Sequence, residues 1–155
     1  MLSRHFTTGR GQAVTESDST RRGARFIVLS DGAAPSSRRE PSASARGLTW
    51  RVVAANNRPL GRSKRVFADF DACVTAAAEL HLRHDALSTA ISFDRTSASW
   101  RWTVALHACP VAVSVRAYSR RVECERAMSQ FLEIVRRQPP VINEIRYVAP
   151  GSRPS

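Results

Sequence analysis

Lysine is almost absent from this chain. Lys64 is the only lysine, so the formal charge of +11 and the pI near 11.3 come from arginine. A charge of that size attracts anionic partners such as nucleic acid, acidic proteins or anionic lipid. Arginine in place of lysine, with abundant alanine and valine, is also what a GC-rich coding sequence produces. The composition alone fits both interpretations.

Cysteines and long apolar runs are scarce as well. The three cysteines, Cys73, Cys109 and Cys124, are odd in number and have no CxxC spacing, which indicates neither a disulfide framework nor a zinc site. No run approaches the roughly 18 consecutive apolar residues that span a bilayer. No apolar signal-peptide core follows Met1. We therefore expect a cytoplasmic protein with reduced thiols and no membrane partner.

Catalytic motifs are missing too. The sequence contains no GxSxG elbow, HExxH pair, P-loop or Gly-rich dinucleotide turn. We expect a protein that is not an enzyme and has no cofactor and no metal site. A thiol- or metal-dependent enzyme is the distant alternative, with Cys73 and Cys124 as reactive thiols or His81 and His84 as metal ligands. Core packing of cysteine and the favourable position of histidine at a helix C-terminus explain these residues without chemistry.

An internal repeat is the strongest feature that is present. "TWRVVAANNRPLGRS" at 49–63 is followed by "SWRWTVALHACPVAV" at 99–113. Each segment predicts two strands joined by a turn, placed at Asn56–Gly61 in the first copy and at Cys109–Pro110 in the second. We align Trp50 with Trp100, 50 residues apart, and expect one extra residue in the second hairpin. Strand alternation predicts that Trp50, Trp100 and Trp102 face a core.

A helix is predicted after each pair of strands. The first is capped by Asp69 and runs to about His84, and the second is capped by Ser119 and runs to about Arg137. Each helix presents apolar positions at spacings of 4, 3 and 4, typical of one buried face. These positions lie 51 residues apart in the two copies: Cys73, Ala77, Leu80 and His84, then Cys124, Met128, Phe131 and Val135.

The pattern predicts an α+β fold of two tandem β-β-β-α repeats, with antiparallel sheets each covered by one helix, a pseudo-twofold relation and a disordered N-terminal region. The expected divisions are a disordered basic tail at 1–24, a first repeat at 25–86 with a flexible insertion at 31–47, a second repeat at 87–138, and a C-terminal strand and tail at 139–155. Seven candidate strands compete for six places. Either 25–30 or 141–148 is therefore surplus.

The repeat resembles that of the YegP-like family of uncharacterised bacterial proteins. "WRVVAANNRPLGRS", followed by Phe67 and by Cys73 six residues later, is similar to the family pattern of a Trp-Arg strand, an Asn-containing turn, an aromatic residue and a capped helix. The match covers Thr49–Cys73 well and Ser99–Cys124 more weakly. It departs from the pattern where Asn57 replaces the turn glycine and Phe67 a tyrosine. The resemblance implies tandem units of three antiparallel strands and a helix, with no established activity.

We therefore expect a small, uncharacterised, non-enzymatic binding or interaction protein of YegP-like type. The alternative is a nucleic-acid-binding protein that uses an arginine-rich sheet face, because basic side chains gather on and near the predicted hairpins. We align Arg51 with Arg101 on that face. A solvated charged face explains the same pattern without a ligand, and a protein partner or a homodimer is also compatible with it. The candidate nucleic-acid-binding residues are Arg51, Arg58, Arg62, Lys64, Arg65, Arg101 and Arg116.

Overall fold

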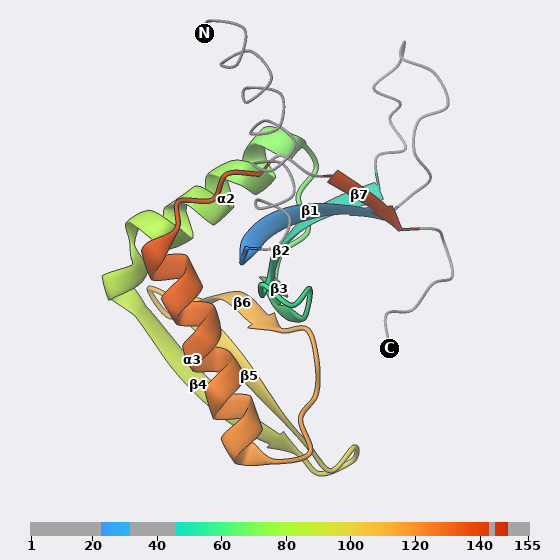
Figure 1. Ribbon diagram of the computed structural model, residues 1–155. Coiled ribbons are helices and arrows are strands. Elements are labelled where there is room, and N and C mark those ends of the chain that lie inside the picture. The colour runs from blue at the N-terminus through green and yellow to red at the C-terminus, as the bar shows by residue number, and fades with distance from the viewer. Residues whose placement is uncertain (1–22, 32–45, 143–144, 149–155) are drawn as a thin grey trace, which may run out of the picture.

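The described part of the chain forms one mixed seven-stranded sheet and two α-helices (Figure 1). The computed structural model describes residues 23–31, 46–142 and 145–148. The strands follow the spatial order β4-β5-β6-β3-β2-β1-β7. Their bounds, with those of the helices and of the short 3-10 helix η1, are β1 Arg25–Asp31, β2 Arg46–Val53, β3 Pro59–Ser63, α2 Phe70–Leu82, η1 His84–Ala86, β4 Leu87–Asp94, β5 Ser99–Leu106, β6 Cys109–Ser114, α3 Arg121–Arg137 and β7 Ile145–Val148.

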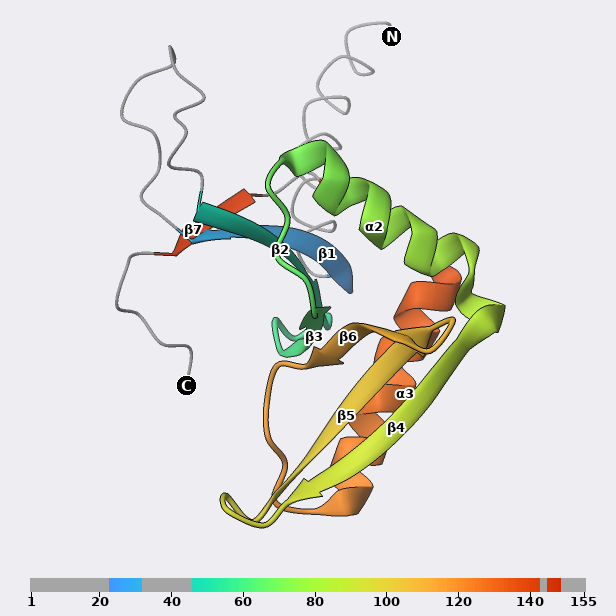
Figure 2. The same cartoon turned by 180° about the vertical axis from the view of Figure 1, so that it is seen from behind.

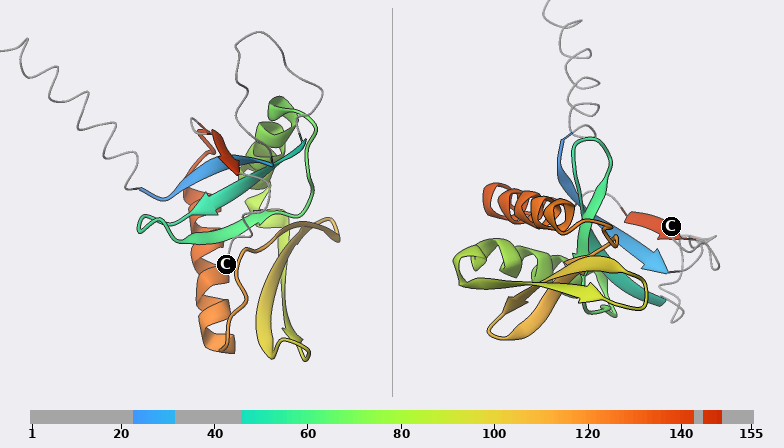
Figure 3. Two further views of the ribbon diagram at one scale, coloured as in Figure 1. Left: turned by 90° about the vertical axis from the view of Figure 1, so that its right-hand side faces the viewer. Right: turned by 90° about the horizontal axis from the view of Figure 1, so that it is seen from below.

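Both helices pack on the same face of the sheet and enclose the main core with it (Figure 3). Leu48, Trp50 and Val52 alternate along β2 and are all buried, as expected for a strand with one covered face. Trp102 and Val104 occupy the same face of β5 and have no exposed surface. The expected core position of Trp50 and Trp102 is confirmed, whereas Trp100 is half-buried at the margin. None of the described helices is long and apolar enough to cross a membrane.

The strands of the two predicted repeats belong to one sheet, because β3 pairs with β6 and so joins them. Arg62 lies opposite Val113 at the centre of this antiparallel pairing. Helix α3 packs against β3 as well as β5, so it covers a strand outside its own predicted repeat at 87–138. Figure 2 shows β4 and β5 in front of α3, with the other face of the sheet turned toward the viewer. The joined sheet buries the edges that β3 and β6 would otherwise expose.

The surplus strand lies at the C-terminal end. β1 pairs antiparallel with β2 from Arg25 to Asp31, so the strand predicted at 25–30 is integral to the sheet. The segment predicted at 141–148 contributes only β7, which pairs parallel with β1 at the edge. The expected disordered tail at 1–24 and insertion at 31–47 lie almost entirely outside the described residues.

The predicted helix caps differ in outcome. Asp69 caps α2 as expected, since its Oδ1 accepts a hydrogen bond from the backbone N–H of Ala72 at 2.7 Å. Ser119 is the wrong residue for α3. Tyr118 is held to Trp100 by two backbone hydrogen bonds of 2.7 and 2.9 Å, and the helix starts only after Arg120, whose side chain makes no capping bond.

His84 is not part of the first helix. Helix α2 ends at Leu82, and His84 opens the short 3-10 helix instead. Its side chain is half-buried and is absent from the core that Cys73 and Leu80 help to form. The inward positions predicted on the second helix are confirmed. Cys124, Phe131 and Val135 are fully buried, and Met128 packs against the core from its margin.

The strand pairing corrects the alignment of the two Trp-Arg segments. Phe67 pairs with Leu48 through an isolated bridge, and Tyr118 pairs with Trp100 in the same way. Leu48 therefore occupies the place of Trp100, and Trp50, two residues further along β2, occupies the place of Trp102. The alignment of Trp50 with Trp100 is wrong by two residues, which keeps the same face of the strand.

The second hairpin is shorter than the first, not longer. Leu106 pairs with Cys109, so the turn consists of His107 and Ala108 rather than Cys109–Pro110. Both turn residues have positive φ angles, 50° and 65°. Two consecutive residues with positive φ are the mark of a tight turn that suits the twist of a hairpin.

Candidate functional site

Two arginines lie side by side on the sheet face that the helices leave uncovered. Arg51 on β2 is directly opposite Arg62 on β3. Opposed residues in an antiparallel pair have Cβ atoms about 4.5–5.5 Å apart, so the two positive charges repel each other. Partial burial lowers the pKa of Arg51, and the charges of Arg62 and Arg146 lower it further. Three guanidinium groups therefore share one region of this face.

Neither Arg51 nor Arg62 makes an ion pair with an acidic side chain in the described part of the chain. The ion pairs between arginine and glutamate join residues of the helical segments, for example Arg121 with Glu125 at 2.8 Å and Arg137 with Glu133. None of the seven candidate nucleic-acid-binding residues makes an ion pair within the described ranges. The arginines of these ion pairs are compensated locally, and the Arg51–Arg62 pair keeps its positive charge.

The remaining candidates are not on one surface. Arg101 is exposed on β5. Hydrogen bonds from Ser97 and Thr96 lower the pKa of the Asp94 carboxyl, and the charge of Arg101 lowers it slightly further. Lys64 is exposed in the connection that follows β3.

Arg58 and Arg116 lie together at another part of the molecule. Both act on the Tyr118 hydroxyl, whose pKa is raised by burial and partly lowered again by these two charges. Arg65 lines a cavity on the helix side of the sheet. Among the seven, only Arg51 and Arg62 are register partners in paired strands, and Arg101 is not the counterpart of Arg51. Thr103 occupies that place, since Thr103 pairs with Val113 as Arg51 pairs with Arg62.

A small apolar cluster that was not predicted from the sequence lies next to Arg51. Ile27, Leu29 and Val53 are buried on the face opposite the helices and form a cluster separate from the main core. The signal for it is the uninterrupted apolar run in "RFIVLS", because a strand buried on both faces loses the alternation of polar and apolar residues. The face that carries Arg51 is therefore apolar over β1 and basic over β2 and β3.

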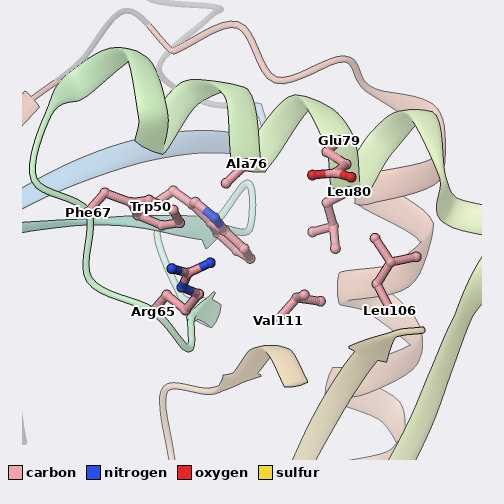
Figure 4. Close-up of a pocket in the computed structure, with 8 residues that line it drawn as sticks. All are labelled: Trp50, Arg65, Phe67, Ala76, Glu79, Leu80, Leu106 and Val111. Carbon is pink, nitrogen blue, oxygen red and sulfur yellow. The ribbon is translucent and has the colours of Figure 1, made fainter. Parts of the chain in front are cut away.

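A cavity of about 110 Å³ lies between α2, β2 and the β5–β6 hairpin. Figure 4 shows Arg65 beside the Trp50 indole, Glu79 on the α2 side, and Leu106 and Val111 across the opening. Its lining residues are Trp50, Arg65, Phe67, Ala76, Glu79, Leu80, Leu106 and Val111. An apolar cavity with one cation and one anion at its margin has the composition of a small-ligand site.

The thiols of the two helices are unsuited to nucleophilic chemistry. Cys73 has no exposed surface, and burial raises the pKa of its thiol to about 11. Burial raises the pKa of Cys124 as well, and the neighbouring Glu125 adds to this shift. Both thiols are therefore protonated at neutral pH, whereas the thiolate is the reactive form. Cys109 is exposed at the start of β6.

The two helical histidines serve as structural hydrogen-bond donors. Nδ1 of His81 donates to the carbonyl of Val135 at 2.6 Å and so connects α2 to α3. Nδ1 of His84 donates to the carbonyl of His81 at 3.0 Å, and its Nε2 lies 3.0 Å from Asp85. Within residues 23–31, 46–142 and 145–148, no three His, Cys, Asp or Glu side chains come close enough to hold a metal ion.

Comparison with known structures identifies the same fold elsewhere. The solution NMR structure of YegP from E. coli, a protein of unknown function, superposes with a TM-score of 0.52 and 8% sequence identity, over 84% of this chain and 97% of YegP. A UPF0339 protein from Shewanella oneidensis gives a TM-score of 0.49 and 7% identity, over 80% of this chain and 92% of that protein. No family model and no curated protein matches the sequence. The YegP-like fold expected from the sequence is confirmed.

Proposed function

We propose that the chain is a non-enzymatic binding protein of YegP-like type, and that the sheet face opposite the helices binds the phosphate backbone of nucleic acid at Arg51 and Arg62. The observation that carries this proposal is the Arg51–Arg62 pair. Two like charges held directly opposite each other destabilise a sheet. A phosphate placed between them replaces this repulsion with charge-assisted hydrogen bonds.

We further propose that the chain is a tandem of two β-β-β-α units related by a pseudo-twofold axis. The register of β3 with β6 supports this, because Gly61 lies opposite Ser114 and Ser63 opposite Ala112, with Arg62 and Val113 between them. Ala112 and Ser114 are each 51 residues after Gly61 and Ser63, so the pairing is symmetric about its centre. The axis passes beside Arg62, which places the basic pair near the middle of the joined sheet.

The chemistry of this face favours the backbone of a duplex over unpaired bases. The aromatic side chains of β1, β2, β4 and β5 lie on the helix side by strand alternation, and they are Phe26, Trp50, Phe93, Trp100 and Trp102. Proteins that bind single strands usually stack bases on aromatic rings. Without such rings, guanidinium groups contact phosphates, which a duplex presents along its outer surface. The proposed binding is therefore independent of base sequence.

A second candidate is the capture of a protein strand or a second copy at β4. This strand runs over eight residues, forms one edge of the described sheet and is mostly exposed. It contains neither proline nor lysine, two residues that protect edge strands from pairing. Sedimentation of the purified full chain tests this candidate. A concentration-dependent dimer that an Ala90→Pro substitution abolishes would support it, and a monomer at all concentrations would count against self-pairing.

Fluorescence anisotropy of the full chain with duplex and single-stranded oligonucleotides tests the main proposal. We expect saturable duplex binding that persists near physiological salt and weakens as salt is raised. Replacing Arg51 and Arg62 together by glutamine should flatten the plot of log affinity against log salt by about two phosphate contacts. The matched control removes two charges from α3 instead, at Arg136 and Arg137. Binding that is absent near 150 mM salt, or equal losses in both double variants, would refute the proposed face.

A further inference from the structure

We infer that the cavity beside Trp50 is a binding site for a small monocarboxylate with a compact apolar body, such as a phenyl or branched alkyl group. This site is on the opposite face of the sheet from the proposed nucleic-acid surface and does not depend on it. Its apolar lining would hold the body of the ligand, and Arg65 would hold the carboxylate.

The charges at the margin select an anion. Glu79 is already engaged, because its Oε1 lies 3.4 Å from Nε of Arg83 on the same helix. Arg65 has no ion pair within the described residues, and its guanidinium lies beside the cavity (Figure 4). The backbone of Arg65 is fixed, since its carbonyl accepts a hydrogen bond from the Ser63 hydroxyl at 2.9 Å. Arg65 is therefore the available partner for a carboxylate, which guanidinium binds with matching geometry.

The corresponding place in the second half of the chain is filled by the protein itself. This step rests on the tandem alignment proposed above, which matches Leu80 with Phe131 and Val111 with Leu60. The Phe131 ring is fully buried, and its centroid lies 4.7 Å from that of Trp102. Leu60 is also buried there. The first half has smaller side chains at both positions and keeps a cavity beside Trp50, so a ligand ring there would take the place that Phe131 takes beside Trp102.

The volume limits the ligand to a small body. A cavity of about 110 Å³ is smaller than an engineered apolar cavity of about 150 Å³ that accepts benzene, and several times larger than the space for one water. This pocket is partly open to solvent rather than enclosed, so a phenyl ring or a branched chain of about four or five carbons can enter it while the carboxylate stays at the mouth beside Arg65. Larger bicyclic bodies such as indole exceed this space.

Titration of the full chain with phenylacetate and isovalerate, monitored by tryptophan fluorescence and ligand-observed NMR, tests the inference. Benzyl alcohol and phenethylamine serve as neutral and cationic probes of matched shape. We expect saturable binding of the two carboxylates and at least tenfold weaker binding of the amine. Arg65→Gln should weaken carboxylate binding about tenfold or more and leave the alcohol unchanged, because a hydrogen bond to a charged group is lost. The control Arg116→Gln should have no effect.

Filling the cavity provides a second test. Leu80→Phe introduces the ring that the other half already contains and should abolish binding of every probe. Val111→Leu adds one methylene group at the opposite wall of the cavity. If Leu80→Phe does not fold, Val111→Leu is the variant that tests whether filling the cavity weakens binding. Nucleic-acid binding measured on the same variants should stay unchanged, which separates the two sites. Failure of both carboxylates to bind at millimolar concentration, equal binding of all probes, or full binding by the filled variant would overturn the inference.

Discussion

Adding one methyl group at Gly61 should destabilise the fold. A Cβ atom built at this position would lie 2.5 Å from Cη2 of Trp102 and 2.8 Å from Cδ2 and Cε2 of Phe131. Carbon atoms pack best at about 3.5–4.0 Å, so both rings would have to retreat by roughly 1 Å. Trp102 and Phe131 have no exposed surface and pack against each other, with ring centroids 4.7 Å apart. Neither ring has free space to enter.

The expected loss is about 1–3 kcal/mol, the usual result of overpacking a filled core. Alanine lowers the conformational entropy of the unfolded chain, which offsets up to about 1 kcal/mol of this strain. Because the two aromatic rings are rigid and cannot move aside easily, we expect the net loss to stay within this range. For a domain of this size, we expect the melting temperature of Gly61→Ala to fall by roughly 3–12 °C. In the tandem alignment that we propose, Gly61 matches Ala112, which already carries a methyl group, and Phe131 matches the smaller Leu80.

Urea and thermal unfolding, followed by circular dichroism, measure this loss. A double-mutant cycle with Phe131→Leu gives the coupling, since leucine removes the ring atoms that the new methyl group meets. We expect Gly61→Ala to cost less in the Phe131→Leu background than in the wild-type chain. A Gly61→Ala variant within 0.5 kcal/mol of wild type, or equal costs in both backgrounds, would show that the close approach of the rings to β3 is wrong.

Four further predictions concern a helix cap, thiol reactivity, the pH dependence of stability and a charge. Asp69→Ala should lower the unfolding free energy by about 1 kcal/mol, since it removes the α2 cap, while Ser119→Ala should leave it within 0.5 kcal/mol; denaturant titration compares them. Cys73 should resist a thiol reagent until denaturant is added, whereas Cys109 should react at once. Because the pKa of Cys73 is about 11 when folded and about 8.5–9 when unfolded, the unfolding free energy should fall as pH rises from about 9 to 11, and Cys73→Ala should reduce this slope. Arg62→Gln should weaken duplex binding yet keep or raise the melting temperature, since it relieves a repulsion; a clear drop in melting temperature would indicate a structural role.

The periodicity of the sequence predicted the elements and the inward positions well. The 4, 3, 4 spacing identified Cys73 and Cys124 as buried helix residues, and both have no exposed surface. The register of the hairpins was harder to predict, because "SWRWT" contains two tryptophans that lie on the same face of the strand. Similarity of letters favoured Trp100 as the match to Trp50, whereas backbone pairing selects Trp102. Register depends on turn length, and the two hairpins differ there.

The candidate site could be predicted only where strand alternation applies. Arg51 and Arg62 belong to paired strands, so their shared face follows from the period of two. Arg65 comes after β3 has ended at Ser63, and its direction is set by an irregular connection that has no period. The cavity depends on the sizes of side chains from β2, the connection after β3, α2 and the β5–β6 hairpin. Leu80 of α2 is one of these side chains. No single window of sequence contains that information.

The two proposed sites depend on a single register, which makes them testable together. Arg51 and Trp50 are neighbours on β2, one facing away from the helices and the other lining the cavity. A slip of one residue in β2 would exchange the two faces of the strand and abolish both sites at once. Two-way pairing of Leu48 with Phe67, through backbone hydrogen bonds of 2.8 Å, fixes this register from outside the hairpin. Substitutions of Arg62 or Leu80 keep the register and should each affect one site, whereas a change that breaks the Leu48 pairing should impair both binding activities in proportion.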